Sequence, residues 1–124
     1  MDKVIKVLLV DDERDFLESM SYWFKQKGYS VLTALKGTDA LTLIKKDLPN
    51  IVFLDVIMPE LDGIETAKRI RERNRSLPII MMSAYEKGTR VSTILKPYGI
   101  TEFFDKSADF SKAEDLLKSL LKIH

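Results

Sequence analysis

Short apolar segments that favour β-strands alternate with segments of helical period along the whole chain, and this alternation restricts the possible folds more than any other feature. Three of the apolar segments, VLLV, IVFL and PIIMM, carry no polar residue. Uninterrupted apolar strands are typical of parallel sheets that helices cover on both faces. The predicted strands are Val4–Val10, Ser30–Ala34, Ile51–Leu54, Pro78–Met82 and Ile100–Phe104.

Each predicted strand is followed by residues with the apolar spacing of a helix. Gly28 is expected to end the first helix in a left-handed conformation. The fourth helix, around Thr89–Leu95, should be short because Pro97 disfavours helix at the residue before it. Ser111 and Glu114 predict a capping box at the start of the last helix. Five strands alternating with five helices predict a flavodoxin-like, doubly wound (βα)5 domain, with a five-stranded parallel sheet of order 2-1-3-4-5 and helices on both faces.

Size and composition indicate an ordinary globular domain. The length of 124 residues suits a single unit, so residues 1–124 are expected to form one domain. The formal net charge of +1 creates no strong field for nucleic acid or an anionic membrane. No apolar run approaches the roughly 20 residues of a membrane span, and the N-terminal residues do not resemble a signal peptide. Together with the absence of Cys, these features predict a cytoplasmic protein.

Polar side chains follow four of the predicted strands at the point where each strand ends. Asp11 and Asp12 follow the first strand, and Asp55 follows the third. Ser83 follows the fourth, and Lys106 comes shortly after the fifth. In a doubly wound sheet, ligands bind outside the carboxyl ends of the strands. These five side chains are therefore expected to meet at one edge of the sheet.

The types of these side chains suggest a site for a metal ion and a phosphoryl group. Crowded carboxylates repel one another until protons or a cation neutralise them. Oxygen ligands alone suit a hard ion, and Mg²⁺ with retained waters is the natural choice. Lys106 and Ser83 could then hold a phosphoryl group by charge and hydrogen bonding. Asp55, alone at the end of an apolar strand, is the expected nucleophile.

Four sequence segments carry a resemblance to a known family. They are VLLVDDE at Val7–Glu13, VFLDVIMPELDG at Val52–Gly63, MMSA at Met81–Ala84 and FFDK at Phe103–Lys106. In order and spacing, the chain resembles the receiver domain of two-component response regulators over essentially its full length. The segment from Asp55 to Gly63 is the most specific of these matches.

The resemblance implies a role for each acidic residue. Asp55 would be the phosphoacceptor for a phosphoryl group from a partner histidine kinase or histidine phosphotransfer protein. Asp12, Asp55 and the backbone carbonyl of Ile57 would bind Mg²⁺ directly, and Asp11 would act through water. The chain would assist only its own phosphorylation and dephosphorylation, so it is not expected to be an enzyme in the usual sense.

The resemblance also implies a conformational switch. Lys106 would pair with the phosphoryl oxygens, and Ser83 would move toward them, leaving space that the ring of Phe103 fills. This would change the surface formed by the predicted helix at Thr89–Leu95, the strand at Ile100–Phe104 and the last helix. The partner that reads this surface would be a downstream protein target or an output domain outside these residues. A phosphorylation-dependent homodimer is also possible, whereas direct contact with nucleic acid or a membrane is not expected.

One departure from the family and several alternatives remain. Ser107 stands where receivers usually have Pro, so the loop after Lys106 is expected to differ. Asp11 and Asp12 could be a helix cap, Ser83 a strand-end hydroxyl, Lys106 a surface lysine and Phe103 plain core filling. A pseudo-receiver would keep the fold without phosphorylation, although such domains typically lack the acids or the lysine. Phosphatases of the haloacid-dehalogenase type need a second Asp where this chain has Ile57.

Overall fold

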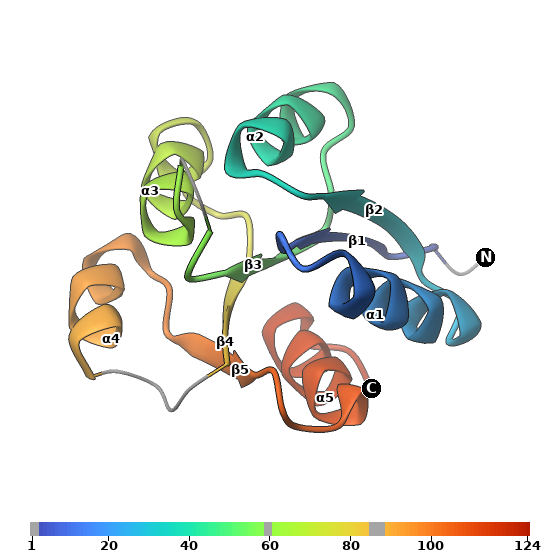
Figure 1. Ribbon diagram of the computed structural model, residues 1–124. Coiled ribbons are helices and arrows are strands. Elements are labelled where there is room, and N and C mark those ends of the chain that lie inside the picture. Colours follow the sequence, from blue (N-terminus) through green and yellow to red (C-terminus); the bar gives the residue numbers. More distant parts are fainter. Residues whose placement is uncertain (1–2, 59–60, 85–88) are drawn as a thin grey trace.

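A parallel sheet with the strand order β2-β1-β3-β4-β5 forms the centre of the protein in the computed structural model (Figure 1). The structure describes residues 3–58, 61–84 and 89–124. The strands are β1 (Lys6–Val10), β2 (Ser30–Ala34), β3 (Ile51–Asp55), β4 (Ile79–Ser83) and β5 (Glu102–Asp105). The helices are α1 (Arg14–Gln26), α2 (Gly37–Lys46), α3 (Gly63–Arg73), α4 (Thr89–Leu95), the 3₁₀ helix η1 (Lys96–Tyr98) and α5 (Phe110–Leu121). The predicted flavodoxin-like fold, strand order and helices on both faces are confirmed.

The central strands are buried on both faces, which explains their uninterrupted apolar sequences. In β1, Leu8 and Val10 pack into a core layer with α2, α3 and α4, whereas Val7 and Leu9 pack into a layer with α1 and α5. Neighbouring residues of a strand point to opposite faces, so both layers need apolar side chains from the same strand. Figure 1 shows α1 and α5 on one side of the sheet and α2, α3 and α4 on the other.

The predicted ends of the elements are correct to within two residues. Gly28 follows α1 with φ of +97°, the left-handed conformation that was expected. β1 begins at Lys6, because Val4 is two-thirds exposed and lies outside the sheet. β5 begins at Glu102, because the left-handed Gly99 turns the chain just before it. β3 includes Asp55, which pairs with Met82 in β4.

The predicted capping box at the start of α5 is wrong. The N-cap residue of α5 is Asp109, and no side chain caps the helix there. Ser111 lies inside the helix, and the Glu114 carboxylate accepts a hydrogen bond of 2.7 Å from the Tyr29 hydroxyl instead. The reason is aromatic packing: Phe110 lies against Phe16 with ring centroids 5.7 Å apart, so the helix begins at Phe110.

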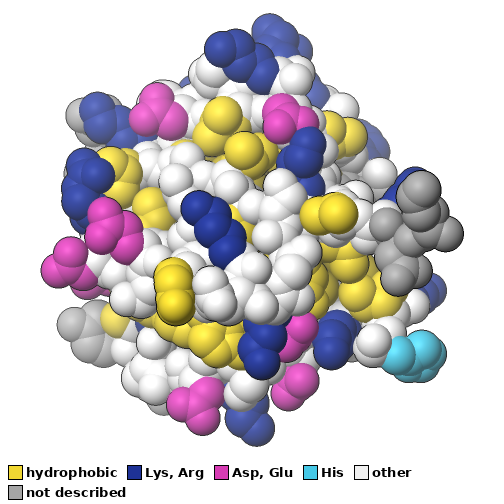
Figure 2. Space-filling view, turned by 90° about the vertical axis from the view of Figure 1, so that its right-hand side faces the viewer, with side chains coloured by type: hydrophobic (Ala, Val, Ile, Leu, Met, Phe, Trp, Pro, Cys, Tyr) yellow, Lys and Arg dark blue, Asp and Glu magenta, His cyan; other side chains and the backbone are white. Residues whose placement is uncertain are grey.

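The surface is of mixed charge. Figure 2 shows basic and acidic side chains interspersed with apolar ones on the face at the right of Figure 1. This distribution agrees with the net charge of +1 and gives this face no field of a single sign. Within residues 3–58, 61–84 and 89–124, none of the helices combines the length and apolar character that a bilayer span requires.

Candidate functional site

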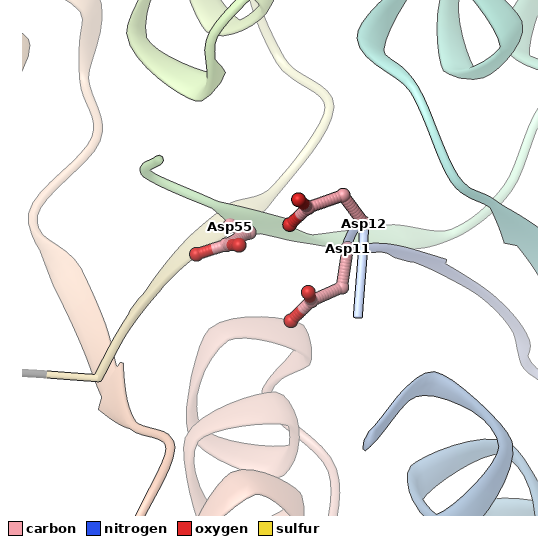
Figure 3. A group of neighbouring side chains, drawn as sticks. All are labelled: Asp11, Asp12 and Asp55. Carbon is pink, nitrogen blue, oxygen red and sulfur yellow. The ribbon is translucent and has the colours of Figure 1, made fainter. Parts of the chain in front are cut away.

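Three carboxylates meet where β1 and β3 end (Figure 3). One oxygen from each of Asp11, Asp12 and Asp55 lies within 4.8 Å of the others. Asp11 is completely buried and Asp55 is 5% exposed, whereas Asp12 is exposed. In Figure 3 the Asp12 side chain points toward Asp55, and Asp11 points to the opposite side of the strand end. The structure thus brings together acidic residues that are 44 positions apart in the sequence, since parallel strands end at the same edge.

Lys106 supplies a positive charge to this cluster from the loop after β5. Its ammonium Nζ lies 2.8 Å from Asp11 Oδ2 and 3.6 Å from Asp55 Oδ2. It also forms an ion pair and a hydrogen bond with Glu13. The side chain of Lys106 is 7% exposed, so these attractions are screened much less than those of a surface pair. Lys106 is therefore not a solvated surface lysine.

Two contacts of Lys106 were not predicted from the sequence. Its Nζ lies 4.7 Å from the ring centroid of Phe16, a cation–π contact, and its pairing with Glu13 joins residues 93 positions apart. Phe16 lies in α1 among the apolar side chains packed against the layer of α1 and α5. The only sign of its contact with Lys106 in the sequence is that this aromatic residue follows Asp11 and Asp12 by about one helical turn. This spacing by itself does not predict a contact with Lys106.

The loop that carries Lys106 is shaped by Ser107, which replaces the usual Pro. Asp105 Oδ1 accepts hydrogen bonds from Ser107 N at 2.9 Å and from Ser107 Oγ at 2.7 Å, which close a local turn. The backbone N–H of Lys106 donates to the carbonyl of Ser83 at 2.9 Å. Two hydrogen bonds donated by Ser107 and one donated by the backbone of Lys106 thus hold the loop. None of the described peptide bonds is cis.

A hollow of about 240 Å³ opens above the acidic cluster. Its lining includes Asp12, Asp55, Ile57, Ser83 and Lys106. It is smaller than a hollow of about 530 Å³ near α1 and β2, so its side chains rather than its size mark it as the site. The side chain of Ile57 is largely exposed at its rim.

Phe103 lies apart from this hollow, on the edge strand β5. Its ring is half-buried and packs against the core layer of α2, α3 and α4. This position suits both plain packing and the predicted switch, because a half-buried ring can still change its surroundings. Its role as a switch stays a prediction.

Gly63 allows the chain to return to the end of β3. Its N–H donates to the carbonyl of Val56 at 3.0 Å, and a Cβ at this position would lie 1.8 Å from the carbonyl oxygen of Asp55. Only glycine fits such a close backbone approach. Asp62, just before it, caps α3 by accepting a hydrogen bond from Glu65 N at 2.8 Å. The LDG sequence therefore shapes the turn that borders Asp55, although Pro59 and Glu60 lie outside the described residues.

Burial changes the proton affinity of the site. Burial, and then the neighbouring Asp11 carboxylate, raise the pKa of Asp55 to about 7, although Lys106 opposes this. Burial by itself lowers the pKa of Lys106, but its bonds to Asp11 and Glu13 outweigh this and hold that pKa above its usual range. Lys106 is therefore a permanent cation at neutral pH, while the carboxylate of Asp55 lacks sufficient positive charge around it.

The donor set suits a hard divalent cation. All the ligand atoms in the cluster are carboxylate oxygens, the type that Mg²⁺ prefers. Within the described part of the chain, the buried Asp11 Oδ2 has the Lys106 ion pair but no hydrogen bond of good geometry. The raised pKa of Asp55 indicates that too little positive charge surrounds its carboxylate. A bound cation would offset the negative charges of Asp55 and Asp11 together. The residues present therefore fit Mg²⁺.

In metal-free buffer, the free energy of unfolding is expected to fall as the pH rises from about 4 to about 7. Folded Asp55 keeps its proton up to a pKa of about 7, whereas an unfolded Asp releases it near pH ~3.9. Because the folded state binds more protons in this window, raising the pH favours unfolding. The expected loss is on the order of 2 kcal/mol after solvent screening.

Urea unfolding in EDTA at several pH values measures this effect. The Asp55→Asn variant cannot ionise at this position and is the matched control, so its stability should lack this component of the pH dependence. If both proteins showed parallel curves of stability against pH, burial of an ionisable Asp55 would not be the cause.

Comparison with known proteins identifies the class to which this fold and site belong. The family model described as the response regulator receiver domain matches residues 7–119. Sporulation initiation phosphotransferase F of Bacillus subtilis is 30% identical over 118 residues, which cover 95% of this chain and 94% of that protein. The chain therefore belongs to the response regulator receiver domain family, whose members are signalling modules, and the resemblance found in the sequence is confirmed.

Other relatives are longer than this chain. The alkaline phosphatase synthesis transcriptional regulatory protein PhoP of Bacillus subtilis is 38% identical over 82 residues, 66% of this chain and 34% of that protein. The match thus spans about a third of the length of PhoP and of the MprA response regulators. Among solved structures, the response regulator TrrA of Thermotoga maritima, crystallised with Mg²⁺-BeF, is 29% identical with a TM-score of 0.84 over 94% of this chain and 99% of that chain.

Proposed function

We propose that this chain is a phosphoacceptor receiver domain of a two-component or phosphorelay system. In this proposal, Mg²⁺-dependent phosphorylation of Asp55 by a partner histidine kinase or histidine phosphotransfer protein changes the surface of α4, β5 and α5. The observation that carries the proposal is the placement of a nearly buried Asp55 carboxylate 3.6 Å from Lys106 Nζ and beside two further carboxylates.

The proposed reaction transfers a phosphoryl group between two side chains. A carboxylate oxygen of Asp55 attacks the phosphorus of a phosphohistidine, a P–O bond forms and the P–N bond breaks. The histidine nitrogen keeps the electron pair of that bond and takes up a proton, and Asp55 becomes an acyl phosphate. Asp55 suits the role because it ends an apolar strand at the floor of an open hollow, where its oxygens can reach a donor.

Asp12, Asp55 and the backbone carbonyl of Ile57 would hold Mg²⁺, with Asp11 acting through water. When bound, the ion offsets the negative charge of the carboxylates and of the incoming phosphoryl oxygens. The fit of the acidic cluster supports this assignment, as does the TrrA structure, which is a complex with Mg²⁺-BeF.

Lys106 and Ser83 would stabilise the transferred group. Lys106 already lies within the site, held by Asp11, Glu13 and Phe16, so little reorganisation is needed for its ammonium to pair with phosphoryl oxygens. Ser83 lines the same hollow at the end of β4, where its hydroxyl could donate to the phosphoryl group. Movement of Ser83 would be linked to Phe103, two positions from the end of β5.

The proposed partners follow from the family. A kinase or phosphotransfer protein would approach Asp55, and a downstream target or an output domain would read the α4–β5–α5 surface. A cytoplasmic location, a phosphorylation-dependent homodimer and the absence of direct nucleic-acid and membrane contacts stay predictions. A pseudo-receiver function is not favoured, because the acids and the lysine are all present and lie together.

Intact-protein mass spectrometry after incubation with acetyl phosphate tests the proposal. A gain of one phosphoryl group per chain is expected with Mg²⁺, and almost none is expected when EDTA replaces the metal. The reason is that the acidic cluster alone repels an anionic donor. Equal labelling with and without Mg²⁺ would remove the metal from the proposal, and no labelling in either condition would favour the pseudo-receiver.

A further inference from the structure

A cavity of about 400 Å³ lies between the end of α3 and η1, and basic side chains dominate its lining. Lys68, Arg71 and Arg75 contribute three positive charges, against one negative charge from Glu72. The cavity shares no lining residue with the hollow above Asp55. It is therefore a separate basic site in a chain whose net charge is only +1.

Arg71 is the innermost cation of this cavity. It is 9% exposed, and its guanidinium donates from Nε to the carbonyl of Tyr98 at 2.7 Å and from Nη1 to the carbonyl of Asn74 at 3.1 Å. Both acceptors are neutral. In residues 3–58, 61–84 and 89–124, no carboxylate forms an ion pair with Arg71, and its Nη2 has no hydrogen-bond partner.

A buried cation without an anion is energetically unfavourable. Desolvation penalises the charged form, and burial accordingly lowers the pKa of Arg71. The planar guanidinium fork fits the oxygens of a phosphate or a carboxylate. Two further cations border the same space: Lys68, whose Nζ lies 5.8 Å from the ring centroid of Tyr98, and the exposed Arg75.

We propose that this cavity binds the oxyanion group, phosphate or carboxylate, of a small ligand. Arg71 donates from the floor of the cavity through Nη2, and Lys68 and Arg75 supply charge at its rim. The volume falls within the range of small-molecule sites. Because only three residues separate η1 from β5, a bound anion would hold the end of α3 against the segment that precedes β5 in the proposed output surface.

The test is an NMR titration of the metal-free ¹⁵N-labelled chain with sodium phosphate, and in parallel with sodium succinate, at constant ionic strength set by sodium chloride. Saturable shifts are expected at the amides of Asn74 and Gly99, with a dissociation constant on the order of 1 mM. Tighter binding of phosphate would indicate a phosphate-bearing ligand, and tighter binding of succinate would indicate a carboxylate. Shifts that grow without saturation in both arms would overturn the proposal.

Variants of the chain distinguish specific anion binding in this cavity from a general attraction of anions to a basic surface. Arg71 itself supports two backbone carbonyls, so the double variant Lys68→Ala with Arg75→Ala is preferable. It should weaken binding at least about tenfold, whereas Lys25→Ala with Lys45→Ala, which removes two exposed cations from α1 and α2, should leave it unchanged. Equal binding by both double variants would overturn the proposal and leave Arg71 as a structural link between α3 and η1.

Discussion

Replacing Asp55 with asparagine is expected to abolish the Mg²⁺-dependent phosphoryl gain completely while leaving the fold intact. The amide has nearly the same size as the carboxylate, but it is not a nucleophile and carries no charge to attract a metal ion. Because the ionised carboxylate is buried beside Asp11, the uncharged variant should also be more stable than the wild type in EDTA at pH 8. The variant should therefore combine loss of function with a gain of stability.

Two measurements check this combination. Mass spectrometry after incubation with acetyl phosphate reports the phosphoryl gain, and urea unfolding reports the stability. Asp12→Asn is the matched control. Asp12 is exposed, and its neutralisation should weaken the binding of Mg²⁺ without removing the nucleophile. Full labelling of the Asp55→Asn protein would show that another residue accepts the phosphoryl group. A loss of stability in this variant would contradict the electrostatic argument.

Replacing Gly63 with alanine is expected to destabilise the protein by about 3 kcal/mol, although alanine normally favours a helix. The added Cβ would lie 1.8 Å from the carbonyl oxygen of Asp55 and 2.9 Å from Cα of Val56. Both atoms belong to the backbone at the end of β3, so neither can give way without moving Asp55. A slower phosphoryl gain should therefore accompany the loss of stability.

Gly99→Ala is the control for this prediction. Gly99 has φ of +72°, but a Cβ there would meet no atom within 4 Å. Its substitution should cost only the strain of a left-handed alanine, on the order of 1 kcal/mol. Urea unfolding measures the loss of stability in both variants. Gly63→Ala reports the clash of a Cβ with the backbone of Asp55, whereas Gly99→Ala reports backbone strain alone. If Gly63→Ala costs no more than Gly99→Ala, the contact with Asp55 does not restrict this position.

The arrangement of the sheet and the position of the site could be predicted from the sequence. Apolar runs such as VLLV and IVFL require cover on both faces, and this requirement leads to a parallel sheet with helices on either side. Asp55 and Ser83 end their strands and Asp12 lies just after β1, and the ends of parallel strands meet at one edge, so their convergence follows from topology alone. Each of these inferences depends on residues within one segment and on a general rule of sheet geometry.

Local signals misled where tertiary packing was stronger. The Ser111 and Glu114 pair has the spacing of a capping box, but Phe110 packs against Phe16 and Glu114 bonds to Tyr29. A cap contributes only about 1 kcal/mol, which burial of an aromatic side chain can exceed. The sequence contained the local preference but not the competing contact.

The sequence alone therefore determined where the strands lie to within two residues, which edge of the sheet is acidic and which family the motifs resemble. Only the tertiary structure decided that Asp11 is fully buried, that Glu13 and Phe16 hold Lys106, and that Arg71 has no counter-ion within the described residues. The physical reason is the range of the interactions. Periodicity and strand-end position act between neighbours in the chain, whereas burial, ion pairing and pKa shifts depend on segments that only folding brings together.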